Sequence, residues 1–193
     1  MDARLLMDSP RDRMVDAALE GLRASGLAGA GINQVVAASG APKGSLYHYF
    51  PEGKLQLVRE ALERFGAQRR EELRTVLAGE GEPALKIRRL FRRAAKAMAR
   101  EEFRLGCAVA GVALDLDEAA EPLRPVLAAE IASWTALIAD GLGPVRGRDA
   151  LARFILTAFE GALVQARAAR GGAPLLEAGD QLAALVRAAT TPS

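Results

Sequence analysis

Apolar residues recur every three or four positions along most of this 193-residue chain, and glycine or proline interrupts the recurrence at intervals. That spacing places the apolar side chains on one face of a helix. No stretch alternates apolar and polar residues between turn signals, as a half-buried strand does. The pattern therefore predicts an all-α fold of one large domain or two small ones.

The interruptions divide the chain into a series of predicted helices. A serine and a proline open the first helix, and the pair Gly79 and Gly81 ends a long helix that connects two halves of the chain. A proline at position 42 opens the third helix, because a first helical position needs no N–H partner. The predicted helices cover residues 10–26, 32–39, 42–50, 55–78, 83–98, 106–116, 123–140, 148–170 and 174–190.

The composition says more about the cellular compartment of the protein than about its binding partner. The 26 basic and 24 acidic residues give a net charge of +2, too small to indicate a nucleic acid by itself. The single Cys107 closes no internal disulfide, the N-terminus has no export signal, and the apolar run Gly106–Leu114 is too short to span a bilayer. We therefore expect a cytoplasmic protein that has no membrane partner.

The segment Ile32–Pro51 has the pattern of a helix-turn-helix. Two helical halves flank Gly40, and glycine suits the left-handed backbone of a sharp turn between helices. In the second half, Leu46 and Phe50 share an inward face. The opposite face is polar and aromatic, which suits the major groove of DNA, and it consists of Gly44, Ser45, Tyr47 and His48.

Other residues of this region are suited to phosphate contacts. Lys43 lies at the start of the second helix, Asn33 and Gln34 lie at the start of the preceding one, and Lys54 follows the next turn. No Asp or Glu occurs between Gly21 and Pro51, so this surface would not repel a polyanion. The sequence therefore permits DNA binding by this segment.

The motif APKGSLYHYFPEGK resembles the segment that closes the DNA-binding domain of TetR/AcrR-type transcriptional repressors. FPEGK, GCAVAGVALD and FEGALVQARAARG together are similar to the LmrA/YxaF-like branch of that family. The resemblance covers the whole chain. It implies a three-helix DNA-binding head over residues 9–70, with the motif at 32–51, and a helical ligand-binding and dimerisation domain over 71–193.

The resemblance also assigns roles to residues. It places phosphate contacts on Gly31, Lys43, Tyr49 and Lys54, and groove contacts on Gly44, Ser45, Tyr47 and His48. Two positions depart from the family. Gly31 replaces the usual Ser or Thr, which removes a capping hydroxyl, and Leu55 replaces an acidic residue at the start of the fourth helix. Tyr49 lies between the inner and outer faces, so core packing and phosphate contact both fit it.

The resemblance implies a homodimeric repressor that a small hydrophobic effector releases from a palindromic operator; activation in place of repression fits the sequence equally. Large side chains suited to the effector pocket are also suited to the core: Phe91, Met98, Phe103, Val109, Trp134 and Phe159. Helices 148–170 and 174–190 would form the dimer interface, although intrachain packing gives the same pattern.

Other chemistry has little support in the sequence. His48 is the only histidine, and the polar residues do not cluster at catalytic spacing, so we expect no enzyme, no metal site and no cofactor. Cys107 fits core packing or redox sensing. The arginine-rich stretch 88–93 fits a solvated face, a membrane contact or a second DNA contact. A carrier of hydrophobic ligands would share the C-terminal half but would bind no operator.

Overall fold

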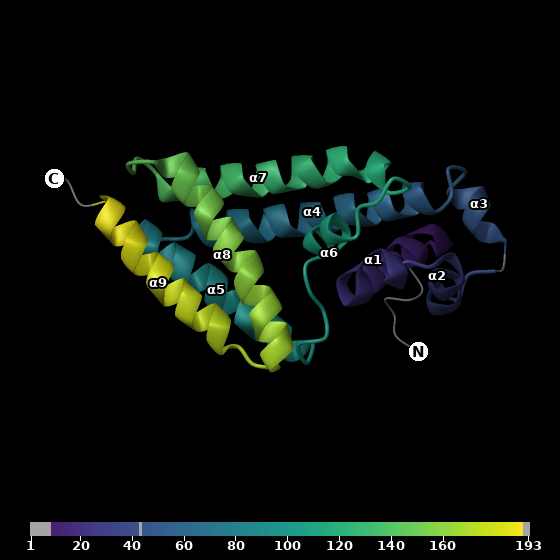
Figure 1. The fold of residues 1–193 in the computed structure, drawn as a ribbon, viewed down its shortest axis with the longest axis horizontal. Helices are drawn as coiled ribbons and strands as arrows, with labels where there is room; N and C mark the ends of the chain where they lie inside the picture. Colours follow the sequence, from purple (N-terminus) through teal and green to yellow (C-terminus); the bar gives the residue numbers. More distant parts are fainter. Residues whose placement is uncertain (1–8, 43, 191–193) are drawn as a thin grey trace. The chain divides into compact units, whose positions relative to one another are not determined.

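The computed structural model describes residues 9–42 and 44–190. It is helical throughout, and within those two ranges it contains no strand, which confirms the all-α prediction (Figure 1). A short 3₁₀ turn over Glu121–Leu123 precedes α7. The α-helices are α1 Pro10–Gly29, α2 Ile32–Ser39, α3 Ser45–Tyr49, α4 Lys54–Ala78, α5 Pro83–Arg100, α6 Ala108–Leu114, α7 Arg124–Leu142, α8 Arg148–Ala169 and α9 Ala173–Thr190.

The chain forms two compact units. The first unit contains the described residues up to Gly66 together with Ala108–Ala128, and the second contains Ala67–Cys107 and the described residues from Ala129 onward. Helices α4 and α7 therefore each begin in the first unit and end in the second.

Helix α1 begins as the sequence predicts but ends later. The Ser9 hydroxyl accepts a hydrogen bond from the Asp12 backbone N–H at 3.1 Å, and Pro10 occupies the first turn, where no N–H partner is needed. The predicted end near Gly26 appears as a kink, at which Gly26 adopts a φ of 59° before the helix resumes to Gly29. Glycine accommodates this left-handed backbone without strain.

Helix α6 packs against α1 within the first unit. The Leu27 backbone N–H donates to the Asp115 carboxylate at 2.8 Å. A Cβ placed on Gly26 would lie 2.1 Å from that same carboxylate, so the contact requires glycine. This link joins residues 88 positions apart, and the spacing of apolar residues gave no indication of it.

In the second unit, α5, α8 and α9 lie side by side (Figure 1). The ring of Phe91 on α5 is completely buried and meets Phe159 of α8 edge to face, with ring centroids 5.1 Å apart. A Cβ placed on Gly179 of α9 would lie 2.7 Å from the Phe91 Cβ, so the absence of a side chain there lets the two helices approach. Edge-to-face pairing adds about 0.5–1.5 kcal/mol beyond burial.

The stretch Glu121–Leu142 is long and apolar enough to cross a membrane, with a mean hydropathy of 1.2. This stretch is longer than the apolar run Gly106–Leu114, on which the expectation of no membrane span was based. Core helices of soluble proteins meet the same criterion, so it is weak evidence for a membrane span. Within the second unit, the buried carboxylate of Glu130 in this stretch forms an ion pair with Arg70 of α4.

Candidate DNA-binding site

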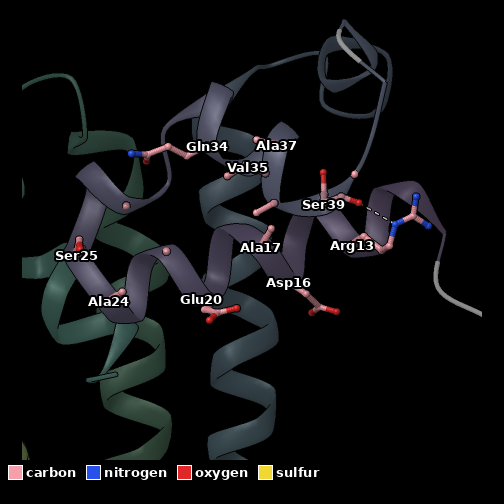
Figure 2. Close-up of a pocket in the computed structure, with 14 residues that line it drawn as sticks. Arg13, Asp16, Ala17, Glu20, Ala24, Ser25, Gln34, Val35, Ala37 and Ser39 are labelled. Atoms are coloured by element: carbon pink, nitrogen blue, oxygen red, sulfur yellow. Dashed lines mark hydrogen bonds between the residues drawn. The ribbon is translucent and has the colours of Figure 1, made fainter. Parts of the chain in front are cut away.

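The corner between α2 and the following loop has the predicted left-handed backbone. Gly40 adopts φ 63° and ψ 20°, and its N–H donates to the Ala37 carbonyl. The Arg13 side chain of α1 donates to the Ser39 carbonyl at 3.0 Å and ties the end of α2 to α1 (Figure 2). This tie fixes the point from which the chain departs toward α3.

Helix α3 is shorter than predicted, because it begins at Ser45 rather than at Pro42. Gly44 adopts a φ of 90°, which is incompatible with a right-handed helix and sets the start of α3 one residue later. The Pro42 carbonyl accepts hydrogen bonds from both the Ser45 N–H at 3.1 Å and the Ser45 hydroxyl at 2.7 Å. The predicted site residue Lys43 lies outside the described residues.

Two buried side chains anchor α3. Leu46 is 1% exposed and Phe50 is 0% exposed, and the Arg11 guanidinium of α1 lies over the Phe50 ring, 5.2 Å from its centroid. On the other face, the Tyr47 side chain is 61% exposed and His48 is also exposed. This burial pattern agrees with the inner and outer faces that the sequence predicts for the second helix.

Tyr49 lies between these faces and is half-buried. Its ring meets that of His48 at 72° with centroids 5.0 Å apart. Such edge-to-face contact restricts both rings, so Tyr49 helps to orient the exposed imidazole of His48. A phosphate contact by Tyr49 stays a prediction.

Lys54 has an internal partner that the sequence analysis missed. Its ammonium, at the start of α4, donates to the Leu27 carbonyl near the end of α1 at 2.9 Å. An ammonium carries three N–H donors, so this bond leaves two for other acceptors. Lys54 therefore ties two helices of the first unit together and retains donors for a phosphate.

The two departures from the family pattern have structural outcomes. Gly31 is the N-cap of α2 without a side-chain hydrogen bond, and the exposed Asn33 and Gln34 follow it in the first turn. At the start of α4, the Gln56 side chain accepts from the Glu52 backbone N–H at 3.1 Å. A glutamine thus accepts a backbone hydrogen bond at the start of α4, next to the apolar Leu55.

A groove of about 1,040 Å³ lies between α1 and α2. Figure 2 shows the carboxylates of Asp16 and Glu20 along its α1 side. Carboxylates repel phosphate, so the α1 side of this groove does not extend the candidate DNA-binding face.

The predicted effector-pocket residues belong to both units. Phe91, Met98 and Trp134 are buried in the second unit, which also contains the half-buried Phe103 and Phe159. Val109 lies on α6, in the first unit.

A polar cluster that the sequence analysis missed lies in the second unit. The Cys107 thiol donates a hydrogen bond to the Glu160 carboxyl of α8, and burial raises the pKa of Glu160 above its ordinary value. The thiol and the charge of Arg69 oppose that rise in part. Among the described residues, no group of three His, Cys, Asp or Glu side chains is arranged to hold a metal ion. In the sequence, the only sign of this buried polar group is that a glutamate lies inside the apolar run FEGALV.

Comparison with known proteins agrees with this geometry. Residues 14–61 match the model of the bacterial regulatory proteins of the tetR family, and residues 83–181 match the C-terminal domain of LmrA/YxaF-like transcriptional regulators. The chain belongs to the TetR family of transcriptional regulators. That family is a class of DNA-binding regulators rather than enzymes.

Similar proteins span most of the chain. An uncharacterized HTH-type regulator of Mycobacterium tuberculosis is 34% identical over 88% of this chain and 90% of its own length. The HTH-type transcriptional regulator LmrA of Bacillus subtilis is 29% identical over 86% of this chain and 90% of its own. The resemblance seen in the sequence motifs is therefore confirmed.

Solved structures show the same fold. A regulatory protein TetR from Rhodobacter sphaeroides has a TM-score of 0.82 and 25% identity, covering 89% of this chain and 96% of its own. A cysteine mutant of the TetR family regulator CifR, complexed with 26-bp double-strand operator DNA, has a TM-score of 0.79 and 25% identity, covering 92% and 96%. DNA is thus the partner of this family of proteins.

Proposed function

We propose that the protein is a cytoplasmic, homodimeric repressor that a small hydrophobic effector releases from a near-palindromic operator. The observation that carries the proposal is the two-sided α3, which buries Leu46 and Phe50 and exposes Tyr47 and His48. Each subunit would place its α3 in the major groove, with half-sites about one helical turn or a small multiple apart. Residues 9–70 would bind DNA, and 71–193 would bind the effector and dimerise.

The DNA contacts fall into two groups. Short or exposed residues of α3 and its N-cap would face base edges: Gly44, Ser45, Tyr47 and His48. Donors around them would hold phosphates: Gly31 through its backbone, Asn33, Gln34, Lys43, Tyr49 and Lys54. Exposure of the α2 first turn and the remaining donors of Lys54 support the second group.

Exposed apolar side chains on α8 and α9 support the proposed dimer. Phe154 is 53% exposed and Val164 is 62% exposed on α8, while Leu176 and Leu185 of α9 are 43% and 44% exposed. Between the two α8 residues, the exposed Gly161 has no neighbour near its Cβ position and permits close helix approach. A two-fold axis would bury the same patch on both subunits.

The apolar side chains inside the second unit support the effector site. Phe91, Met98, Phe103, Trp134 and Phe159 would supply its apolar lining, and Glu160 would supply a polar group. Val109 of α6, in the first unit, stays a predicted member of this lining. An effector that prefers a conformation with misplaced heads would weaken operator binding about 5- to 150-fold, for a coupling of roughly 1–3 kcal/mol.

Binding to the DNA upstream of the protein's own reading frame tests the proposal. We expect Tyr47→Ala and His48→Ala to weaken operator binding about 5- to 150-fold more than binding to random duplex, because a base contact contributes about 1–3 kcal/mol. Lys43→Ala should weaken both equally and reduce the salt slope by about 1 per subunit. Equal losses on both duplexes would assign Tyr47 and His48 to positioning.

Two controls complete the test. Absence of a specific shift with every upstream fragment would contradict the regulator proposal and favour a ligand carrier. Transcription of the bound gene in a deletion strain separates repression from activation, since loss of a repressor raises the transcript and loss of an activator lowers it.

A further inference from the structure

Helix α5 carries a row of cations along one side, which lines a groove in the second unit. The groove has a volume of about 660 Å³, and its other wall is formed by Thr75 and Val76 in the last turns of α4 and by Gly79 just after that helix. The cations occur at helical spacings that keep them on one side of α5 over about 16 Å. They are Arg89, Arg92, Arg93, Lys96 and Arg100.

The groove has an excess of positive charge. Glu72 is the single carboxylate among its lining residues, and it is already held by Arg69 at 2.7 Å and by Arg93 at 3.3 Å. Arg89 donates to the Glu80 carbonyl at 2.6 Å, which holds its guanidinium at the mouth of the α4–α5 turn. Across residues 9–42 and 44–190, Lys96 and Arg100 form no ion pair.

Another arginine of α5, Arg88, differs from Lys96 and Arg100 because it has a carboxylate partner on a neighbouring helix. Arg88 is paired with Asp180 of α9, and that aspartate also experiences the charge of Arg92. A carboxylate of the chain therefore faces the cations on the α9 side of α5, whereas on the α4 side Glu72 is the single carboxylate among the groove's lining residues and faces five cations. An unbalanced row of cations inside a concave surface attracts anions more strongly than scattered exposed charges do.

We propose that this groove binds a small soluble polyanion that carries two or three phosphate groups. Arginine forks and a lysine ammonium are the usual protein ligands of phosphate, and Arg92, Lys96 and Arg100 follow one another at intervals of four residues, about 6 Å along the helix. The concave wall and its Glu72 carboxylate favour a compact ligand over a DNA duplex, which needs a broad surface without carboxylates. The site does not depend on the proposed contacts of α3 with DNA.

Calorimetric titration of the full chain with inorganic tripolyphosphate tests the site. The double variant Lys96→Gln/Arg100→Gln should bind at least tenfold more weakly, because each charged hydrogen bond contributes about 1.5–3 kcal/mol. The matched control Arg74→Gln/Arg104→Gln removes the same charge from exposed positions of the second unit outside the groove and should stay within about twofold of the parent.

A variant that should bind tripolyphosphate more tightly strengthens the test. Glu72→Gln removes the single lining carboxylate and releases Arg93, so tripolyphosphate should bind about threefold or more tightly. This variant also tests the proposal if the double variant fails to fold.

Several outcomes would overturn the proposal. Equal losses in the two double variants would show general surface charge, and unchanged or weaker binding by Glu72→Gln would exclude the groove. Failure of tripolyphosphate to bind at millimolar concentration would exclude a small polyanion. If random-sequence duplex DNA alone responded to Lys96→Gln/Arg100→Gln, the face would be a nucleic-acid surface. None of these readouts depends on an operator.

Discussion

Helix α3 of the first unit and helices α8 and α9 of the second expose different kinds of side chain. On α3 the first unit exposes Tyr47 and His48, which combine an aromatic ring with a hydrogen-bonding group. On α8 and α9 the second unit exposes apolar side chains, among them Phe154, Val164 and Leu185. Both sets project from helices whose other faces are buried, so helix amphipathicity alone does not distinguish them.

The difference indicates the partner of each surface. Polar aromatic groups on a short helix that lacks carboxylates suit the base edges and phosphates of DNA. A set of exposed apolar side chains gains free energy only when another apolar surface covers it. We therefore expect substitutions in the two units to change different equilibria.

The largest effect, on dimer dissociation, should follow from a charged residue among the exposed apolar side chains of α8. Phe154→Glu or Val164→Glu should raise the dissociation constant of the proposed dimer at least about 30-fold, because central interface residues contribute about 2 kcal/mol or more. Analytical ultracentrifugation measures the change. Leu114→Glu is the matched control, since Leu114 of α6 is 85% exposed in the first unit and should leave the association unchanged. Equal effects of both would contradict the proposed interface.

The helix ends of the two units provide a second contrast. Helices α2 and α8 both end in a left-handed residue, but this residue is Gly40 in the first unit and Arg170 in the second. Gly40→Ala should lower the free energy of unfolding by about 1–2 kcal/mol, which is the cost of a Cβ in this conformation. The site is open around the Cβ position, so denaturant titration should report backbone strain alone. An unchanged midpoint would mean that the corner rearranges.

At the end of α8, the expected change in the free energy of unfolding has the opposite sign. Arg170→Gly should raise the free energy of unfolding by up to about 1 kcal/mol, because glycine relieves the strain at φ 48° but adds entropy to the unfolded chain. Arg170→Ala keeps the Cβ and should change the denaturant midpoint little. A gain with alanine equal to that with glycine would point to the arginine side chain rather than to the backbone.

Two carboxyl groups, Asp12 in the first unit and Glu160 in the second, respond oppositely to pH. In the first unit, hydrogen bonds from the Ser9 hydroxyl and from Arg64 lower the pKa of Asp12. This contribution to stability is present above the ordinary pKa of 3.8 and is lost as the pH falls through the lower folded value. In the second unit, burial raises the pKa of Glu160, so stability falls as the pH rises from 4.5 to the folded pKa.

We expect Glu160→Gln to produce the smallest of these changes. Its unfolding free energy should match that of the parent below pH 4.5 and exceed it at neutral pH, because the amide needs no ionisation and still accepts a hydrogen bond from Cys107. Thermal unfolding measured from pH 4 to 8 checks this. A constant difference across that range would assign the effect to packing.

Local sequence rules predicted much of the fold. Apolar spacing identified every α-helix of the described residues, and Gly40 marked the corner of the helix-turn-helix. The inward and outward faces of α3 follow from residues four apart, such as Leu46 and Phe50. The start of α3 was wrong because the left-handed Gly44 overrides the preference of Pro42 for a first helical turn.

Contacts between distant residues required the tertiary structure. The sequence determined which faces are apolar, because periodicity and turn chemistry act over a few residues. It did not determine that α6 packs on α1 through Gly26 and Asp115, that Lys54 holds the Leu27 carbonyl, or that Cys107 meets Glu160. A helical face is compatible with many partners of the same polarity, so only the packed chain decided which partner each face received.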